Sequence, residues 1–279
     1  MPELPEIVAH AERLSASFSG AELSSFRPLH LAALKTVDPD PGLTSGVVLT
    51  GVGHRGKYLT LTFGEDYTYV VHLMQGGRLR PDPSQARRPQ GGMARWTFAD
   101  GRALLLTEAG TERKAGVWLV AGTPTACEPL DGLGPDAHSM SRDRFAAALQ
   151  EERVRLHGFL RTQRRLAGIG RLLANEILHS AGLSPFAVTD TLDDEQIDRL
   201  HTSVGAVIAD AIEHERRLDE IGRSVDRPNR VHHRVGLPCP VCNDEIRAVE
   251  YRRYTVAYCP TCQTGGRVLA DNTTSRFLK

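Results

Sequence analysis

Two Cys-x2-Cys pairs near the C-terminus constrain the fold of this chain more than any other feature. Cys239 and Cys242 form the first pair, Cys259 and Cys262 form the second, and 16 residues separate the pairs. This spacing indicates two knuckles that bind one tetrahedral Zn²⁺ through four thiolates, which leaves no position for a substrate. We therefore predict one structural zinc ion, with a redox pair or an iron–sulfur cluster as the alternative. The fifth cysteine, Cys127, is predicted to be an unpaired packing residue, and the histidines show no zinc-ligand spacing with the cysteines.

Charged residues are balanced in number but unevenly distributed. The 279 residues include 34 Lys+Arg and 34 Asp+Glu, so net charge alone does not indicate a nucleic-acid partner. Six arginines and no acid lie between Arg153 and Asn175, and residues 222–279 hold ten basic and five acidic residues. A basic hairpin braced by zinc suits contact with phosphates. A zinc ribbon that serves folding or binds a protein is the alternative.

No feature of the sequence indicates a membrane or a secretory route. No stretch approaches the ~18 apolar residues of a membrane span, and the acids Glu3 and Glu6 stand where a secretory signal carries basic residues. Hydrophobic residues make up 41% of the chain, which is enough for a substantial core. We expect a globular cytoplasmic protein with no membrane contact.

The apolar pattern predicts an α+β protein of several domains. Residues 1–122 are expected to form a catalytic domain with a short helix and a β-sandwich, residues 123–140 a Gly- and Pro-rich linker, residues 141–221 a helical domain, and residues 222–279 a zinc-finger domain. The expected strands are 47–49, 58–63, 67–73, 96–98, 103–107 and 117–120. The expected helices are 6–18, 145–150, 156–166, 171–181 and 193–217, the last capped by Asp190 or Asp193.

Pro2 gives the chain a candidate nucleophile. Removal of Met1 would expose a secondary amine, and α-amino groups with a pKa near 8 keep a neutral fraction at pH 7. Attack on a sugar C1′ with loss of the base would leave an iminium ion that has no N–H to lose and draws electrons during elimination of the 3′ phosphate. Glu3 is a candidate acid for opening the ribose ring, and Glu6, one turn along, could orient the amine. Taken alone, these residues also fit a helix-capping proline beside solvated carboxylates.

Three further motifs occur in a fixed order with the cysteines. They are Met-Pro-Glu-Leu-Pro-Glu at 1–6, Gly-His-Arg-Gly-Lys-Tyr-Leu at 53–59 and Gly-Ile-Gly-Arg-Leu-Leu-Ala-Asn-Glu at 168–176. With them the whole chain resembles the formamidopyrimidine-DNA glycosylase and endonuclease VIII family. The resemblance implies an N-terminal helix plus β-sandwich, a helical domain with a helix–two-turn–helix, and a C-terminal zinc finger.

The resemblance also implies catalytic roles. Pro2 would form a Schiff base with the sugar, and Glu3 would donate and accept protons, with Glu6 beside them. Lys57 would contact phosphates and assist β-elimination, which agrees with the close approach to a backbone that a glycine-flanked turn allows.

Other residues are implied to contact DNA. Arg253 matches the zinc-finger arginine that grips phosphate and is linked to δ-elimination. Five residues separate it from Cys259, one more than the family leads us to expect, so either the loop bulges or Arg252 takes part. The remaining implied contacts are Gln75, Arg113, Arg171 and Asn175.

Three departures from the family pattern bear on the lesion. Gln75 replaces an intercalating methionine, as in the endonuclease VIII branch, and Ala115 replaces a phenylalanine wedge. Residues 224–236 are few for the loop that caps 8-oxoguanine in some members. Together these favour oxidised pyrimidines or ring-opened bases over 8-oxoguanine. Arg171 replaces an asparagine of the helical signature, so a phosphate contact there would become ionic.

We therefore expect a bifunctional DNA glycosylase/AP lyase of base excision repair. Its partner would be double-stranded DNA with damaged bases or abasic sites, bound by a monomer at the nucleoid of a bacterium. The alternatives are an 8-oxoguanine glycosylase of the same family, a non-catalytic module that binds damaged DNA, and a zinc protein whose partner is another protein.

Overall fold

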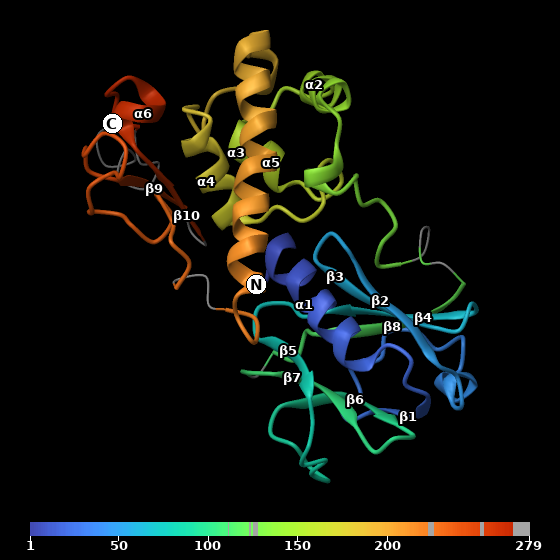
Figure 1. The fold of residues 1–279 in the computed structure, drawn as a ribbon. Coiled ribbons are helices and arrows are strands. Elements are labelled where there is room, and N and C mark those ends of the chain that lie inside the picture. Colours follow the sequence, from blue (N-terminus) through green and yellow to red (C-terminus); the bar gives the residue numbers. More distant parts are fainter. Residues whose placement is uncertain (111, 123, 125–127, 223–225, 252–253, 270–279) are drawn as a thin grey trace. The chain divides into compact units, whose positions relative to one another are not determined.

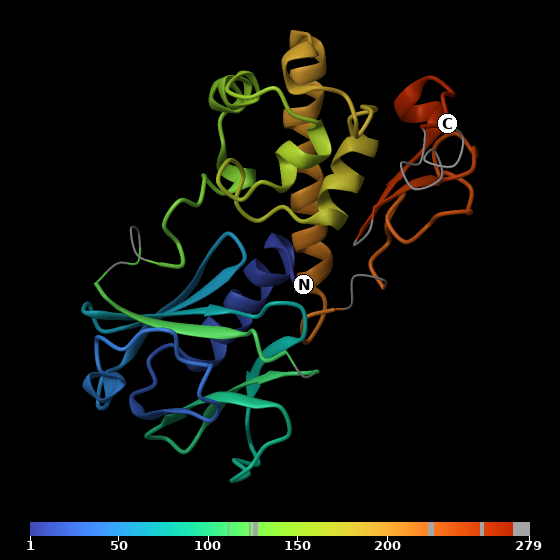
Figure 2. The ribbon, with the colours of Figure 1, turned by 180° about the vertical axis from the view of Figure 1, so that it is seen from behind.

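The computed structural model describes residues 1–279 except 111, 123, 125–127, 223–225, 252–253 and 270–279. The packing predicted for Cys127 and the phosphate contacts predicted for Arg252 and Arg253 lie outside the described residues. The chain divides into two units, Met1–Gly132 and Leu133–Lys279 (Figures 1 and 2). In the described part of the chain, no helix is both long enough and apolar enough to cross a membrane.

The first unit combines one α-helix with two four-stranded antiparallel sheets. One sheet has the strand order β2-β3-β4-β8 and the other the order β1-β6-β7-β5. The elements are α1 (Leu4–Phe18), β1 (Leu23–Pro28), η1 (Pro41–Thr44), β2 (Leu49–Arg55), β3 (Tyr58–Phe63), β4 (Tyr67–His72), β5 (Gly77–Pro81), β6 (Gly92–Phe98), β7 (Ala103–Glu108) and β8 (Gly116–Ala121).

Alternating apolar residues direct one face of each sheet into a shared core. In β3, Leu59, Leu61 and Phe63 are fully buried, and the residues between them are half-buried. Tyr69 of β4 meets Trp96 of β6 edge to face, with 5.6 Å between the ring centroids. Because this contact joins one sheet to the other, the two sheets form the predicted β-sandwich.

Helix α1 begins with reciprocal hydrogen bonds in its first turn. Glu3 and Glu6 form a capping box, in which the backbone N–H of Glu3 donates to Glu6 Oε2 at 3.0 Å. Pro5 occupies the first turn, where its missing N–H costs no hydrogen bond. The helix buries Leu4 and Ile7 completely and packs against β2 and β3. These contacts fix the N-terminal residues against the sheet.

The second unit is mainly helical and ends in a two-stranded hairpin. Its elements are η2 (Ala137–Ser139), α2 (Arg142–Gln150), α3 (Leu156–Arg161), α4 (Arg171–Ser180), η3 (Thr189–Thr191), α5 (Asp194–Arg216), β9 (Arg247–Tyr251), β10 (Tyr254–Tyr258) and α6 (Pro260–Thr264). Of the two predicted caps, Asp193 is the one that begins α5, because its Oδ1 accepts the Gln196 N–H at 2.8 Å.

Two turns connect α3 to α4, and one glutamine holds them. The Gln163 side-chain amide donates to the carbonyls of Arg161 and Ile169, and its Oε1 accepts the N–H of Gly168 at 3.0 Å. Gly168 has a φ of +102°, which a residue with a side chain rarely adopts. These bonds end α3 at Arg161, five residues before the predicted end, and produce the helix–two-turn–helix arrangement.

The predicted α+β class is confirmed, but β1 and β5 were not predicted, and the predicted strand 47–49 shares only Leu49 with β2. Both β1 and β5 lie at the edge of their sheet. Each ends in a proline, Pro28 and Pro81, and each has few apolar side chains over its five or six residues. Edge strands of this kind carry a weak apolar signal, because a single neighbouring strand and one buried face are enough to hold them.

Candidate active site and metal centre

Pro2 and two glutamates lie together at the start of α1. Pro2 is buried, and Glu3 and Glu6 expose only 7% and 4% of their surface. The hydrogen bond from the Glu3 N–H holds the Glu6 carboxylate next to the peptide that joins Pro2 to Glu3. Met1 is present, so the Pro2 nitrogen belongs to a peptide bond and the free amine is that of Met1.

The environment of this amine favours its neutral form. Its pKa lies below the usual value of 8.0, chiefly because burial penalises the charged form. Arg78 and Lys57 lower the pKa further through their positive charge, whereas Glu3 and Glu6 raise it. An amine in such surroundings has a larger neutral fraction at pH 7, and the neutral form is the one that attacks carbon.

Lys57 lies in the two-residue turn between β2 and β3. Arg55 pairs with Tyr58 across this turn, and Gly56 supplies its positive φ of 56°. Lys57 is only 6% exposed. Burial, followed by the charge of Lys57, lowers the pKa of His72 to about 4. The turn therefore places an ammonium group near both the N-terminal amine and a neutral histidine.

The two loop residues predicted to contact DNA in this unit are placed differently. Gln75 is exposed at the turn between β4 and β5. Arg113 is half-buried, has a φ of 49°, and donates from Nη1 to the Glu108 carbonyl at 2.7 Å. Ala115 is fully buried, and its N–H donates to Glu108 Oε2 at 2.8 Å. Gln75 thus presents its side chain at the surface, whereas Arg113 is held against its own loop.

Two residues of the predicted helical signature also differ in exposure. Arg171 is the exposed first residue of α4. Asn175, one turn later, is 1% exposed and shares a hydrogen bond of 2.8 Å with His232 Nδ1 through its Nδ2. Arg171 therefore reaches the surface, whereas Asn175 packs inside the unit, and its contact with DNA stays a prediction.

The four cysteines predicted as metal ligands come together in the second unit. Cys239 Sγ lies 3.9 Å from Cys262 Sγ, and Cys242 Sγ lies 3.3 Å from Cys259 Sγ. Sulfurs at the usual distance from a tetrahedral zinc ion would lie about 3.8 Å apart. The donor chemistry and the spacing therefore fit a closed structural metal site.

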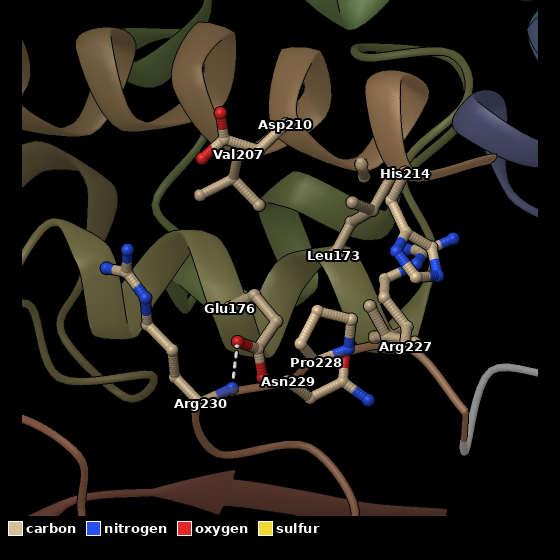
Figure 3. A pocket seen from close by; sticks show the side chains of 11 residues that line it. Leu173, Glu176, Val207, Asp210, His214, Arg227, Pro228, Asn229 and Arg230 are labelled. Carbon is tan, nitrogen blue, oxygen red and sulfur yellow. Dashed lines mark hydrogen bonds between the residues drawn. The ribbon is translucent and has the colours of Figure 1, made fainter. Parts of the chain in front are cut away.

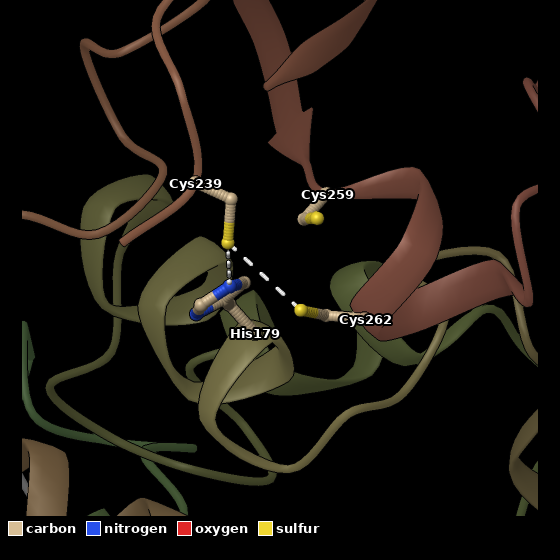
Figure 4. A group of neighbouring side chains, drawn as sticks. All are labelled: His179, Cys239, Cys259 and Cys262. Atoms are coloured by element: carbon tan, nitrogen blue, oxygen red, sulfur yellow. Dashed lines mark hydrogen bonds between the residues drawn. The ribbon is translucent and has the colours of Figure 1, made fainter. Parts of the chain in front are cut away.

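A histidine that was not predicted lies beside this site. His179 of α4 has its Nε2 3.3 Å from Cys239 Sγ (Figure 4). Its ring nitrogen and the sulfurs of Cys239, Cys259 and Cys262 all lie within 4.8 Å of one another. Sequence spacing could not identify it, because 59 residues separate it from the first cysteine. The contact joins the helical segment to the first cysteine knuckle.

Arg78, whose charge acts on the N-terminal amine, and His72, whose pKa the charge of Lys57 lowers, were not predicted as site residues. Arg78 stands in β5 and donates from Nη1 to the Gly77 carbonyl at 2.8 Å. His72 ends β4, and its ring lies 4.5 Å from that of Tyr58. Both flank the turn that carries Gln75, and recognising β5 as a strand would have pointed to Arg78 from the sequence.

A pocket in the second unit holds none of the predicted site residues. It lies between α4, α5 and residues 227–230, and Asp210 and His214 reach it from α5 (Figure 3). Glu176 lines it but accepts the backbone N–H groups of Arg230, Val231 and His232 at 2.7–3.0 Å. This carboxylate therefore anchors the segment after α5, which explains its burial without a ligand.

Comparisons with known proteins match most of the chain. Residues 1–117 match the family model described as formamidopyrimidine-DNA glycosylase N-terminal domain, and residues 132–220 match the one described as formamidopyrimidine-DNA glycosylase H2TH domain. The formamidopyrimidine-DNA glycosylase of Chloroflexus aurantiacus is 30% identical over 277 residues, covering 94% of this chain and 98% of the relative. An uncharacterized formamidopyrimidine-DNA glycosylase-like protein of Mycobacterium tuberculosis is 42% identical over 165 residues, covering 57% of this chain and 100% of the relative.

The fold is also similar to solved structures. A Lactococcus lactis FPG mutant in complex with Fapy-dG containing DNA superposes with a TM-score of 0.84 and 22% identity, covering 94% of this chain and 100% of that one.

Proposed function

Because the chain belongs to the formamidopyrimidine-DNA glycosylase and endonuclease VIII family of DNA glycosylases, we propose that it removes damaged bases from double-stranded DNA and then cuts the strand at the same site. The observation that carries this proposal is the buried group of Pro2, Glu3 and Glu6 with Lys57 close to the N-terminal amine. The similarity in fold to a protein in complex with Fapy-dG containing DNA adds support for the substrate.

Pro2 is the proposed nucleophile once Met1 has been removed. Its neutral amine bonds to C1′ as the bond from C1′ to the base breaks, and the base leaves with a proton. Protonation of the ring oxygen by Glu3 opens the sugar and gives an iminium ion. Loss of a C2′ proton then sends an electron pair toward this cation and expels the 3′ phosphate. One residue therefore serves both the glycosylase and the lyase step.

The surrounding charges support this assignment. Burial, Arg78 and Lys57 all lower the pKa of the Met1 amine, and we expect the same surroundings to favour a neutral Pro2 amine, one residue along, at pH 7. Glu6 receives the backbone N–H of Glu3 and so steadies the turn that carries both Pro2 and the proposed acid. We assign Lys57 to the phosphate beside the lesion, where its ammonium would stabilise the negative charge of the leaving group.

We propose zinc as the ion held by Cys239, Cys242, Cys259 and Cys262. Four thiolates give a closed shell, so the ion would brace the hairpin β9–β10 and take no part in the reaction. We propose Arg252 and Arg253, which follow β9 in the sequence, as phosphate contacts on the strength of the family resemblance.

For the lesion, we propose oxidised pyrimidines or ring-opened bases in preference to 8-oxoguanine. Gln75 is exposed at the tip of its turn and is long enough to enter the space left by a flipped base. Ala115 is too small and too buried to act as a wedge in the opposite strand. Cutting assays on matched duplexes with thymine glycol, 5-hydroxycytosine, a formamidopyrimidine or 8-oxoguanine test this, and preference for 8-oxoguanine opposite cytosine would contradict it.

Borohydride trapping tests the nucleophile. Protein whose Met1 removal has been verified by mass spectrometry should form a covalent adduct with an abasic-site duplex, because borohydride reduces the iminium to a stable amine. Pro2→Gly should lose most of the adduct, and Glu12→Gln, an exposed change on the same helix, should leave it intact. DNA binding without any adduct from processed wild-type protein would instead favour a non-catalytic module that recognises damaged DNA.

A further inference from the structure

The cysteine cluster contains a second set of metal donors. Four donor atoms lie within 4.8 Å of one another, namely one ring nitrogen of His179 and the sulfurs of Cys239, Cys259 and Cys262 (Figure 4). Cys242 is the one cysteine of the cluster outside this group, although its Sγ lies 3.3 Å from that of Cys259. Five of the described side chains therefore offer donors at a place where a tetrahedral ion takes four.

The position of the histidine ring suits coordination. Bonds of about 2.3 Å to sulfur and about 2.0 Å to an imidazole nitrogen place these two donors about 3.5 Å apart at a tetrahedral ion. His179 Nε2 lies 3.3 Å from Cys239 Sγ, and the sulfurs of Cys239 and Cys262 lie 3.9 Å apart. A small adjustment of the ring would therefore bring Nε2 to the fourth corner of a tetrahedron whose other corners are sulfurs.

Packing holds the last turn of α4 against the second cysteine pair. His179 is 4% exposed and lies one residue before the end of α4. Gln263 of α6 donates from Nε2 to the Leu183 carbonyl at 2.9 Å, and its Oε1 accepts the N–H of Cys259 at 2.8 Å. This side chain ties the segment after α4 to the metal ligands. The ring is therefore positioned by folding, and little entropy would be lost when it coordinates.

The ring of His179 is not fixed in one tautomer by a second hydrogen bond. Its Nδ1 is buried and has no hydrogen-bond partner among the described residues. The bond made by one ring nitrogen commonly decides whether the other carries a proton or binds a metal. Here the proton can stand on Nε2, where it donates to Cys239, or on Nδ1, which leaves the Nε2 lone pair facing the cluster. The ring can thus support a complete set of thiolates or replace one of them.

The thiolates differ in their access to solvent. Cys239 and Cys259 expose 3% and 0% of their surface, whereas Cys242 is half-buried. Its neighbours Val241 and Asn243 are exposed, and Asn243 turns the chain with a φ of 64°. Cys242 therefore stands in the outward loop of its knuckle, where reagents that attack thiolates reach it more easily than Cys239 or Cys259.

We propose that His179 is an alternative metal ligand that takes the position of Cys242 when that thiolate is lost, so that the ion stays bound through His179, Cys239, Cys259 and Cys262. With its proton on Nδ1 the ring is neutral, so the donor set then carries three negative charges in place of four. The inference rests on the proposed metal site and adds to it a donor from the helical segment. The hairpin β9–β10 would keep its brace after damage to the exposed thiolate.

The metal content of Cys242→Ala tests this exchange. After loading with zinc and desalting, the variant should retain one ion per chain, as wild type and His179→Phe should. The double variant Cys242→Ala/His179→Phe should retain none above background, because neither alternative ligand is left. Cys259→Ala is the matched control and should also lose the metal, since Cys259 belongs to both donor sets.

X-ray absorption at the zinc edge identifies the ligands. Wild type should fit four sulfurs at about 2.3 Å, and Cys242→Ala should fit three sulfurs and one nitrogen at about 2.0 Å. Equal retention of metal by Cys242→Ala and by the double variant would overturn the proposal, because solvent would then fill the fourth position. Loss of metal from a Cys242→Ala variant that keeps its helical circular dichroism would overturn it as well.

Alkylation covers the case in which Cys242→Ala does not fold. Zinc-loaded protein treated with limiting iodoacetamide gives a fraction modified at Cys242 alone, which peptide mass spectrometry identifies. Native mass spectrometry should find the metal retained in this fraction of wild type and released in that of His179→Phe. Release from both, or retention by both, would overturn the proposal. Wild-type protein that binds no metal would instead contradict the proposed metal site itself.

Discussion

At the scale of single residues, burial lowers the pKa of the N-terminal amine, and charges of both signs around it act on the same pKa. Glu3 and Glu6 favour the protonated amine, and Lys57 and Arg78 favour the neutral one. Each effect has a definite sign, because a nearby negative charge stabilises a cation and a positive charge destabilises it. Removing a nearby carboxylate and removing a nearby cation should therefore shift the pH dependence of the reaction in opposite directions.

In a plot of trapping rate against pH, the rate should fall at low pH as the amine becomes protonated. We predict that Glu6→Gln and Lys57→Gln shift this acidic limb in opposite directions. Glu6→Gln lowers the amine pKa and moves the limb to lower pH, whereas Lys57→Gln raises the pKa and moves it to higher pH. Glutamine at position 6 still offers an oxygen to the Glu3 N–H, so the helix start is kept. Single-turnover trapping between pH 5 and 8 measures both shifts, and equal shifts in one direction would contradict the charge account.

We predict that His179→Phe releases the metal about tenfold faster. The ring N–H beside Cys239 disperses thiolate charge, and losing such an outer partner typically costs about 10–100-fold in metal affinity. Release into a chromophoric chelator measures the rate. His138→Phe, an exposed change in the same unit, is the control. A rate equal to that of wild type would assign His179 to packing alone.

The sequence predicts the residues of the site better than their surroundings. Pro2, Glu3, Lys57 and the cysteines all lie in motifs with a fixed local spacing, and such spacing is visible without a structure. His179 and Arg78 reach their sites from other elements, through packing that no local pattern records. Asn175 shares a motif with Arg171, yet one turn of helix carries it from the surface into the interior.

At the scale of elements, the boundaries of helices follow their caps. Asp193 and Gln196 exchange hydrogen bonds at the start of α5, and four acidic residues lie in or near its first turn. Acidic side chains in this position also favour the helix through its dipole. Such signals are local, which is why the predicted limits of α5 differ by one residue at each end from those observed.

We predict that Asp193→Ala lowers the free energy of unfolding of the second unit by about 1 kcal/mol. The substitution removes the acceptor of the Gln196 N–H and leaves that donor without its cap. Asp210→Ala, an exposed change within the same helix, should have little effect or stabilise slightly. Chemical denaturation followed by helical circular dichroism compares the two variants, and equal midpoints would rule out a capping contribution.

Strands were located from the sequence where most of their side chains are apolar and buried, as in β3 and in the edge strand β8. β3 was located to the residue, because Leu59, Leu61 and Phe63 alternate with residues of the opposite face. β1 and β5 escaped prediction because an edge position tolerates proline and charge. The end of α3 was missed for another reason, since Gln163 turns the chain with side-chain bonds that mimic backbone ones.

At the scale of the whole molecule, buried neutral histidines recur in both units. Burial is the main cause that lowers the pKa of His10, His72 and His232 to about 4, and that of His157 to about 3. In the unfolded chain these rings titrate near 6.5. Below pH 6.5 the unfolded chain therefore binds more protons than the folded one. The free energy of unfolding then decreases as the pH is lowered from about 6.5 to about 4.

We predict that His10→Gln makes stability less dependent on pH in this window. Each such histidine contributes a slope of up to about 1.4 kcal/mol per pH unit, and removing one removes one proton from the difference. Glutamine can still donate to the Leu79 carbonyl that His10 Nε2 contacts at 2.8 Å. Denaturant titrations at pH 5 and pH 7.5 give, for each protein, the change in the free energy of unfolding between the two pH values. An identical change in the variant and the wild type would contradict a buried neutral ring.

The capping box of α1 has a consequence for how the protein is handled. The same two carboxylates that start the helix flank the proposed nucleophile, so folding itself sets the distance between acid and amine with few rotatable bonds left to order. Any extension of the chain before Pro2, including a retained Met1 or an affinity tag, keeps this geometry but replaces the amine with an amide. Such a protein would fold and bind its metal normally yet lack the proposed Pro2 nucleophile, so preparations should be compared by the identity of their first residue before their activities are compared.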